Sequence, residues 1–294
     1  MAETAAFRRY PRLDARERPV EERIRDYRMI PEEIPAAELK KQACRCLDCG
    51  IPFCHGFGCP LANRIPDFNE LVCRDRWQDA LALLHSTNNF PELTGLLCPA
   101  PCESSCTLDP DFGAVSIRRI ELRLAERGWR EGWIIPAVIP PASRKRAAVI
   151  GSGPSGLTVA SDLLLKGHEV TLFEAFHKTG GVLVYGIPEF RLPKDIVASE
   201  IAFMEKMGLK IECNAVVGKT VSLDELFEDG YDAAYIGVGA GLPKFLNIPG
   251  ENLINIYSAN EYLTRANLMK GYLFPEYDTP IAKGKNVVVL GAGN

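Results

Sequence analysis

The sequence has 294 residues, which is enough for about two domains, and its formal net charge of −4 argues against a nucleic-acid-binding protein. No apolar run approaches the roughly 20 residues that span a bilayer, and residues 1–10 lack the apolar core of a secretory signal. We therefore expect a cytoplasmic protein that binds neither nucleic acid nor a membrane. The compositional anomaly is the set of ten cysteines, because nine lie between Cys44 and Cys106 and only Cys213 lies outside.

The N-terminal part of the chain is predicted to be helical. Residues 1–40 are charged and interrupted by prolines, which indicates an arm with short helices. Residues 77–85 and 117–127 place apolar side chains at helical spacing. Residues 133–143 are rich in proline, as is typical of a linker. We therefore expect a helical domain over residues 1–140.

The rest of the chain alternates predicted strands with helices. Strands are expected at 145–151, 170–174, 210–213 and 231–238, with helices at 157–165 and 196–207. This order is typical of an α/β fold with a parallel sheet, and we assign a Rossmann-like domain to residues 141–283. A further strand is expected at 286–290, so residues 284–294 are predicted to begin a second nucleotide-binding domain.

The cysteine spacing indicates iron–sulfur clusters. Thiolates are soft ligands, and four of them suit a cluster or a zinc ion. In a reducing compartment such a group is more often metal-binding than disulfide-bonded. Structural zinc normally uses two CxxC pairs, whereas only one is present, and seven cysteines exceed the need of one zinc ion. The candidate ligands are Cys46, Cys49, Cys54, Cys59, Cys98, Cys102 and Cys106, while Cys44, Cys73 and Cys213 fall outside the spacing and are expected to be small apolar residues.

A glycine-rich turn between a predicted strand and helix indicates dinucleotide binding. The run is Gly151-Ser-Gly153-Pro154-Ser155-Gly156. The first glycine permits the tight turn, the second lets the backbone approach a pyrophosphate, and the third allows close packing of helix on strand. Glu174 ends the next strand, where an acidic residue accepts hydrogen bonds from a ribose. These features do not choose between FAD and NAD.

The end of the chain repeats half of this pattern. Gly291 and Gly293 follow three valines, which matches the start of a second glycine motif. An ordinary C-terminal strand is the alternative. On the first interpretation the chain is truncated inside a nucleotide site, and we expect it to act poorly on that nucleotide by itself.

Four sequence runs together resemble a known family. They are CRCLDCGIPFCHGFGCPLANRIPDFNELV, TNNFPELTGLLCPAPCESSC, GSGPSGL and GGVLVYGIPEFRLPK. They resemble the small (β) subunits of NADPH-dependent glutamate synthase. Wider relatives include dihydropyrimidine dehydrogenase and the large subunit of NADH-dependent ferredoxin:NADP oxidoreductase. The resemblance covers residues 38–294, but four residues separate Cys54 from Cys59 where many relatives have three.

The resemblance implies two [4Fe-4S] clusters in the helical domain. The second cluster would have an oxygen ligand from Glu121, whose alternative role is a solvated charge on a helix. One set of ligands would be Cys46, Cys49, Cys54 and Cys106, and the other Cys59, Cys98, Cys102 and Glu121.

The resemblance also implies FAD at the first glycine turn and NADPH at the second. Around FAD it places Gly151, Gly153, Pro154, Ser155 and Gly156 at the pyrophosphate, Glu174 at the ribose, Gly181, Val182 and Arg191 near the flavin, Val217 near the adenine, and Gly237 and Gly239 at a second approach. Gly291 and Gly293 would contact NADPH.

The function implied is an electron-input subunit with no acid–base catalytic residue. Electrons would pass from NADPH through FAD and the clusters to a large catalytic subunit that converts glutamine and 2-oxoglutarate to glutamate. One alternative is an NAD(P)H oxidoreductase subunit of a ferredoxin-linked or flavin-bifurcating complex. Another is a non-catalytic relay or assembly subunit, and a zinc-binding adaptor is a third.

Overall fold

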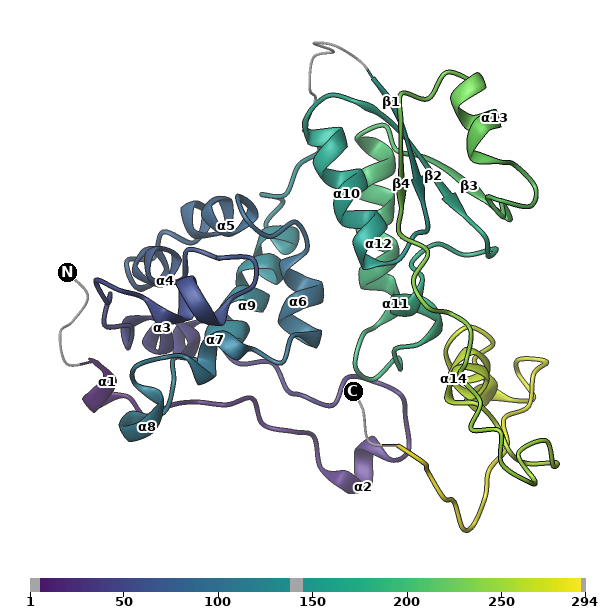
Figure 1. The fold of residues 1–294 in the computed structure, drawn as a ribbon. Helices are drawn as coiled ribbons and strands as arrows, with labels where there is room; N and C mark the ends of the chain where they lie inside the picture. Colours follow the sequence, from purple (N-terminus) through teal and green to yellow (C-terminus); the bar gives the residue numbers. More distant parts are fainter. Residues whose placement is uncertain (1–5, 138–144, 292–294) are drawn as a thin grey trace.

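The chain folds into a helical N-terminal half and a C-terminal half built on a parallel sheet (Figure 1). The computed structural model describes residues 6–137 and 145–291. The predicted boundary near residue 140 and Gly293 lie outside these residues. Within them, every helix is too short or too polar to cross a bilayer.

The helical half is a set of short helices around one apolar core. The predicted helix at 77–85 is confirmed, and the one predicted from residue 117 continues to Arg130. Phe68, Leu84 and Leu124 are fully buried in this core. The elements are α1 (Ala6–Arg9), α2 (Val20–Arg23), α3 (Ala36–Cys44), the π-helical turn η1 (Cys54–Gly58), α4 (Ile65–Cys73), α5 (Trp77–His85), α6 (Pro91–Leu97), α7 (Pro101–Ser104), α8 (Asp109–Phe112) and α9 (Ile117–Arg130).

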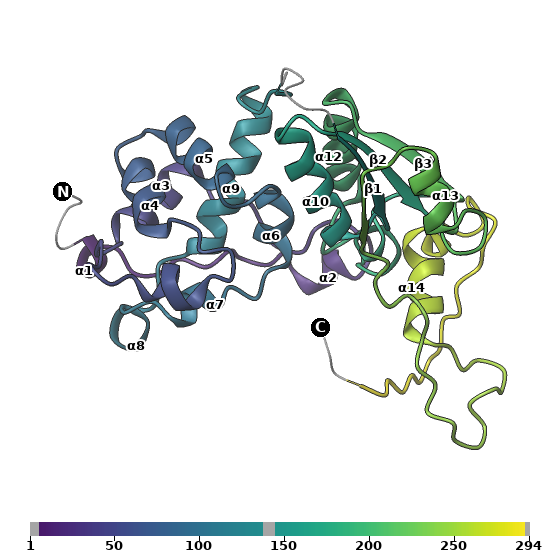
Figure 2. The same ribbon diagram turned by 45° about the horizontal axis from the view of Figure 1, so that its top comes forward.

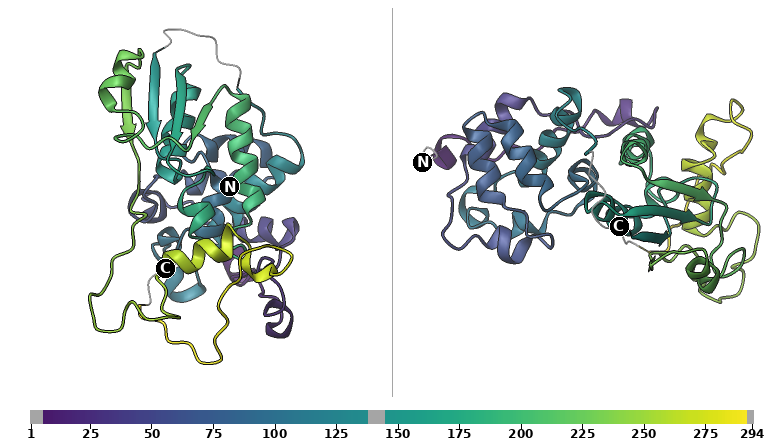
Figure 3. Two further views of the ribbon diagram at one scale, coloured as in Figure 1. Left: turned by 90° about the vertical axis from the view of Figure 1, so that its right-hand side faces the viewer. Right: turned by 90° about the horizontal axis from the view of Figure 1, so that it is seen from above.

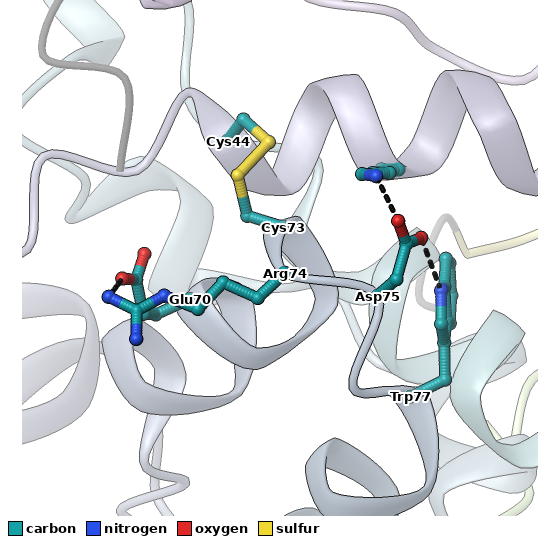
Figure 4. Close-up of a disulfide and its surroundings, with 7 residues drawn as sticks. Cys44, Glu70, Cys73, Arg74, Asp75 and Trp77 are labelled. Carbon is teal, nitrogen blue, oxygen red and sulfur yellow. Dashed lines mark hydrogen bonds and ion pairs between the residues drawn. A yellow bond between two sulfur atoms is a disulfide. The ribbon is translucent and has the colours of Figure 1, made fainter. Parts of the chain in front are cut away.

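A disulfide joins the C-terminal ends of α3 and α4 (Figure 4). It links Cys44 to Cys73, so the expectation that both are free apolar residues was wrong. The two cysteines are 29 residues apart, and only the packing of α3 against α4 brings them together. Beside the bridge, Lys40 on α3 pairs with Asp75 just after α4, which adds a second cross-link between the two helices.

The C-terminal half has four parallel strands in the order β3-β2-β1-β4. The strands predicted in residues 145–238 are confirmed with small shifts in their ends. The elements are β1 (Arg146–Ile150), α10 (Pro154–Leu165), β2 (Glu169–Glu174), α11 (Val182–Tyr185), α12 (Lys194–Lys206), β3 (Lys210–Cys213), α13 (Leu223–Glu228), β4 (Ala233–Ile236), α14 (Ala259–Asn267) and the 3₁₀ turn η2 (Gly271–Leu273).

Helices cover both faces of the sheet (Figure 2). Successive side chains of a strand point to opposite faces. In β1, Val149 therefore packs with the residues of α10 and α12, whereas Ala148 and Ile150 pack with Leu226 of α13. Burial on both faces explains why β1 reads as a continuous apolar run.

The two halves share an apolar core. Phe90 and Leu93 at α6 and Leu122 of α9 are buried in the same cluster as Leu157 of α10 and Val197 of α12. The views in Figure 3 show the helical half beside the helices on one face of the sheet. Packing therefore fixes the cysteine-bearing half against the glycine turn.

The strand predicted at 286–290 is absent, because these residues pair with no other strand among the described residues. Their valines and Leu290 are exposed, and the segment lies away from the sheet (Figures 1 and 2). The prediction of a strand in this segment was wrong: backbone hydrogen bonds to a neighbouring strand, rather than apolar composition alone, make a strand.

Candidate functional site

Four of the predicted ligand cysteines line one cavity in the helical half. Cys46 follows α3, Cys54 begins η1, Cys106 follows α7, and Cys49 lies on the loop between α3 and η1. Among the described residues, no three His, Cys, Asp or Glu side chains converge closely enough to hold a single metal ion.

The electrostatics of this cavity suit a positively charged metal group. Burial raises the pKa of Cys46 to about 11. Burial, followed by the negative charges of Cys46 and Cys106, raises the pKa of Cys54 to about 12. Several thiols that repel one another as thiolates lose that repulsion when they bind a shared cation. The residues present thus fit a cluster with four thiolate ligands.

The second predicted set gathers around α7 and α9. Burial raises the pKa of Cys102 well above its usual range, and the negative charges of Glu121, Cys59 and Cys98 add to the rise. Cys102 thus lies within electrostatic reach of the other three predicted ligands, and also of Glu103.

Glu121 is a buried carboxyl group, which rules out the alternative of a solvated helix charge. Its exposed fraction is 6%, and burial raises its pKa to about 7. Asn63 Nδ2 donates to Glu121 Oε1 at 2.9 Å, and the Thr87 hydroxyl donates to Asn63 Oδ1 at 2.8 Å. Asn63 and Thr87 could not be predicted from the sequence, because 24 residues separate them from each other and 58 separate Asn63 from Glu121.

The four residues that separate Cys54 from Cys59 form the rest of the π-helical turn η1. A π-helical turn spans one residue more than an α-helical turn, so it absorbs an insertion without displacing its neighbours. Gly58 ends this turn, and a Cβ atom there would lie 2.7 Å from the Cα of Cys102. The lack of a side chain at Gly58 therefore lets η1 approach α7 closely.

The first glycine turn has the geometry of a dinucleotide-binding loop. Gly151 has a φ of +102°, and a Cβ atom on Gly156 would lie 1.9 Å from the Gly151 carbonyl oxygen. Beside Gly153 there is open space, so another group can approach the backbone there. Gly153 is also the N-cap of α10, whose first residues are Pro154 and Ser155. The free N–H groups of this helix end favour a phosphate.

Glu174 connects this turn to a neighbouring loop. It is buried, accepts a hydrogen bond from the backbone N–H of Ser152 at 3.0 Å, and accepts another from Phe176 at 2.9 Å. The Ser152 hydroxyl also bonds Glu174 and accepts from the N–H of Gly180 at 2.9 Å. This role of Ser152 was not predicted, because the glycine motif specifies no residue between its first two glycines.

Two further predicted glycines lie beside the turn. A Cβ atom on Gly181 would lie 2.8 Å from the Cα of Gly153. Gly237 donates its backbone N–H to Ile150 at 2.8 Å, and its carbonyl oxygen lies close to Gly151. The structure thus brings Gly181 and Gly237 together with the motif.

The remaining predicted residues are more scattered. Val182 is exposed beside Gly181, and Gly239 has open space on its Cβ side. Val217 packs on the α13 face of the sheet. Arg191 and Gly291 are exposed, and within residues 6–137 and 145–291 no hydrogen bond or ion pair connects them to the glycine turn.

Comparisons with known proteins match both halves of the chain. Residues 23–133 match the family described as dihydropyrimidine dehydrogenase domain II, 4Fe-4S cluster, and residues 145–294 match pyridine nucleotide-disulphide oxidoreductase. The helical half is therefore a 4Fe-4S cluster domain.

Matches that cover nearly all of this chain are found among glutamate synthase (NADPH) small chains. That of Mycobacterium tuberculosis is 42% identical over 100% of this chain and 61% of its own length. That of Bacillus subtilis is 41% identical over 95% and 59%, and that of Azospirillum brasilense is 36% identical over 94% and 58%. The resemblance noted in the sequence is confirmed. The chain spans about three fifths of the length of these relatives.

Proposed function

The chain belongs to the pyridine nucleotide-disulphide oxidoreductase family, and from this premise we propose that it passes electrons from NADPH through FAD and two 4Fe-4S clusters to a partner protein. The observation that carries the proposal is the cavity lined by Cys46, Cys49, Cys54 and Cys106. It lies in a 4Fe-4S domain that packs directly on the oxidoreductase domain.

The proposal assigns ligands in two sets. The four cysteines of the cavity hold one cluster. The second cluster is held by Cys59, Cys98, Cys102 and Glu121. Asn63 orients Glu121 through the 2.9 Å hydrogen bond, which keeps one carboxylate oxygen available for the metal.

We assign FAD to the glycine turn of a Rossmann-like domain over residues 141–283. The helix end at Gly153 receives the pyrophosphate, and Glu174 receives the ribose. Gly181, Val182 and Arg191 are assigned to the flavin side, Val217 to the adenine side, and Gly237 and Gly239 to the second approach. We assign the helical domain to residues 1–140. We assign residues 284–294, which include Gly291 and Gly293, to the start of the NADPH-binding domain.

The chemistry is redox chemistry supplied by the cofactors when they are bound: FAD takes a hydride from NADPH, and the clusters carry single electrons. The chain's own residues hold and orient these groups. Buried apolar side chains such as Phe90 and Leu122 also exclude water between the two halves.

The partner we propose is the large catalytic subunit of a cytoplasmic glutamate synthase, which makes glutamate from glutamine and 2-oxoglutarate. The names of the relatives support this choice. The second candidate is a ferredoxin-linked or flavin-bifurcating complex, because the two matched domains also suit such an electron-input subunit.

The test is anaerobic purification of the full-length protein, with iron, sulfide, zinc and flavin quantified per chain. Iron, sulfide and FAD are expected. Cys54→Ala should remove about half of the iron, whereas Cys213→Ala, outside both sets, should remove none. Zinc without iron and sulfide would overturn the proposal, and the identity of a co-purifying large subunit would decide between the two partners.

A further inference from the structure

Arg45 is a fully buried cation that immediately precedes the ligand Cys46. Its exposed fraction is 0%. One terminal nitrogen donates to the carbonyl of Ala114 at 2.7 Å, and the other donates to the carbonyls of Phe112 and Gly113 at 2.6 and 2.7 Å. The side chain thus crosses from the end of α3 to the loop after α8.

The charge of Arg45 has no carboxylate partner in residues 6–137 and 145–291. Its acceptors are neutral: three backbone carbonyls and, at 3.4 Å, the amide oxygen of Gln42. Its Nε–H has no acceptor. Buried cations are normally paired, because an isolated charge loses its hydration without compensation.

Arg12 nearby shows the contrasting arrangement. It reaches the same Ala114 carbonyl, at 3.4 Å, but it also forms ion pairs with Asp14 at 2.7 Å and Glu103 at 2.6 Å. A carboxylate partner is therefore possible beside this loop, and Arg45 lacks one.

Arg45 lies beside the cavity that the four cysteines line. Its guanidinium binds the carbonyl of Ala114, and the next residue, Val115, is part of the cavity wall. Cys46, on the adjacent residue, lines the same cavity as Cys106. Arg45 is thus connected to the cavity wall at both ends of its side chain, through Cys46 in the chain and through the Ala114 carbonyl at its guanidinium.

We propose that Arg45 is the counter-cation of the cluster held by Cys46, Cys49, Cys54 and Cys106, and that its charge raises the reduction potential of that cluster. The inference rests on the proposed function for the cluster itself. Reduction adds one electron, delivered from the reduced flavin, and so adds one negative charge to the cavity. A cation in the protein interior stabilises this more negative state, because charges there are screened less than in water.

The experiment is an EPR-monitored redox titration of the full-length holoprotein and its variants. The relevant signal is the one that Cys54→Ala removes. Arg45→Met and Arg45→Gln should decrease the equilibrium constant for reduction at least tenfold, which is about 59 mV for one electron. Arg45→Lys keeps the charge, so its potential should fall by less than half of that shift.

The matched control is Gln42→Met, one turn earlier on α3. Gln42 is also buried, and it bonds the Pro11 carbonyl at 2.9 Å and the Leu13 N–H at 3.1 Å. This variant removes these hydrogen bonds and the 3.4 Å contact with Arg45, but it removes no charge. It should be less stable but keep the wild-type potential.

Unchanged reduction potentials in both neutral variants would overturn the proposal. Arg45 would then have only the structural role of holding the loop after α8 through its hydrogen bonds. If the neutral variants lose this cluster, the Arg45→Lys variant tests the proposal instead. Retention of the cluster in the lysine variant supports the role of Arg45 as a counter-cation, and loss of the cluster there as well refutes it. Failure of the proposed function is distinct, because wild-type protein would then lack iron and sulfide.

Discussion

Two buried glutamates meet where the helical half packs on the sheet half. Glu92 lies on α6 and Glu200 on α12, with exposed fractions of 4% and 5%. Trp129 donates its indole N–H to Glu200 at 3.1 Å. Burial, and then the negative charge of Glu92, raise the pKa of Glu200 far above its usual range. Burial also raises the pKa of Glu92. At neutral pH Glu200 is therefore protonated and donates to Glu92.

This proton makes the stability of the protein depend on pH. The unfolded chain releases the proton above its ordinary pKa of 4.5, whereas the folded chain keeps it. The stabilisation is thus complete below the unfolded pKa and is lost as pH rises toward the folded pKa. The loss is about 1.4 kcal/mol per pH unit while only the folded state is protonated.

Glu200→Gln removes this dependence and keeps the contacts. The amide NH₂ can donate to Glu92, and the amide oxygen can accept from Trp129. The free energy of unfolding of the variant, relative to wild type, should therefore rise with pH. Between pH 6 and pH 8 the rise should be on the order of 2–3 kcal/mol.

The assay is anaerobic urea unfolding of the holoprotein at several pH values, followed by tryptophan fluorescence, to which Trp129 at the interface contributes. Glu205→Gln is the control, because Glu205 lies on the same helix but is exposed. It should show no pH trend relative to wild type. A flat difference between Glu200→Gln and wild type from pH 6 to pH 8 would refute the buried proton.

Three further substitutions test other parts of the structure. Gly156→Ala puts a Cβ atom 1.9 Å from the Gly151 carbonyl oxygen, so FAD affinity should fall at least tenfold, or about 1.4 kcal/mol, in flavin titrations; unchanged affinity would contradict the loop geometry. Cys73→Ser opens the loop that the disulfide closes over a separation of 29 residues, so it should lower the free energy of unfolding in urea by about 3–4 kcal/mol. A thiol reductant should abolish this difference, because it opens the same disulfide in the wild type. Glu121→Gln should keep the second cluster and Glu121→Ala should lose it, as iron analysis will show; full iron in both would exclude Glu121 as a ligand.

The features that the sequence predicted are those encoded by neighbouring residues. The glycine turn follows from six consecutive residues, and the structure reproduces its tight φ at Gly151 and its close packing at Gly156. β1, β2 and β4 were predictable because each is a short, mainly apolar run beside a turn, whereas β3 alternates charged and apolar residues. Cys46, Cys49 and Cys54 lie within nine residues, so their shared cavity needs little long-range information.

The features that the sequence did not predict depend on distant parts of the chain. Cys44 meets Cys73 only because α3 packs on α4. Arg45 is a charged residue that would normally be exposed, and only the loop at residues 112–114 makes its burial possible. Glu92 and Glu200 belong to different halves, so neither has a local pattern that marks it as buried.

The core shared by the two halves limits how the protein can be recombined. Phe90 and Leu122 are buried in one cluster with Leu157 and Val197, and the glutamate pair lies between the same helices. A chimera could join the cysteine-bearing half of this chain to the sheet half of a relative at residue 140. In such a chimera, the two halves would not match at the apolar cluster or at the glutamate pair. A functional chimera should take α6, α9, α10 and α12 from one parent, even though the chain connection between the halves is a single proline-rich segment.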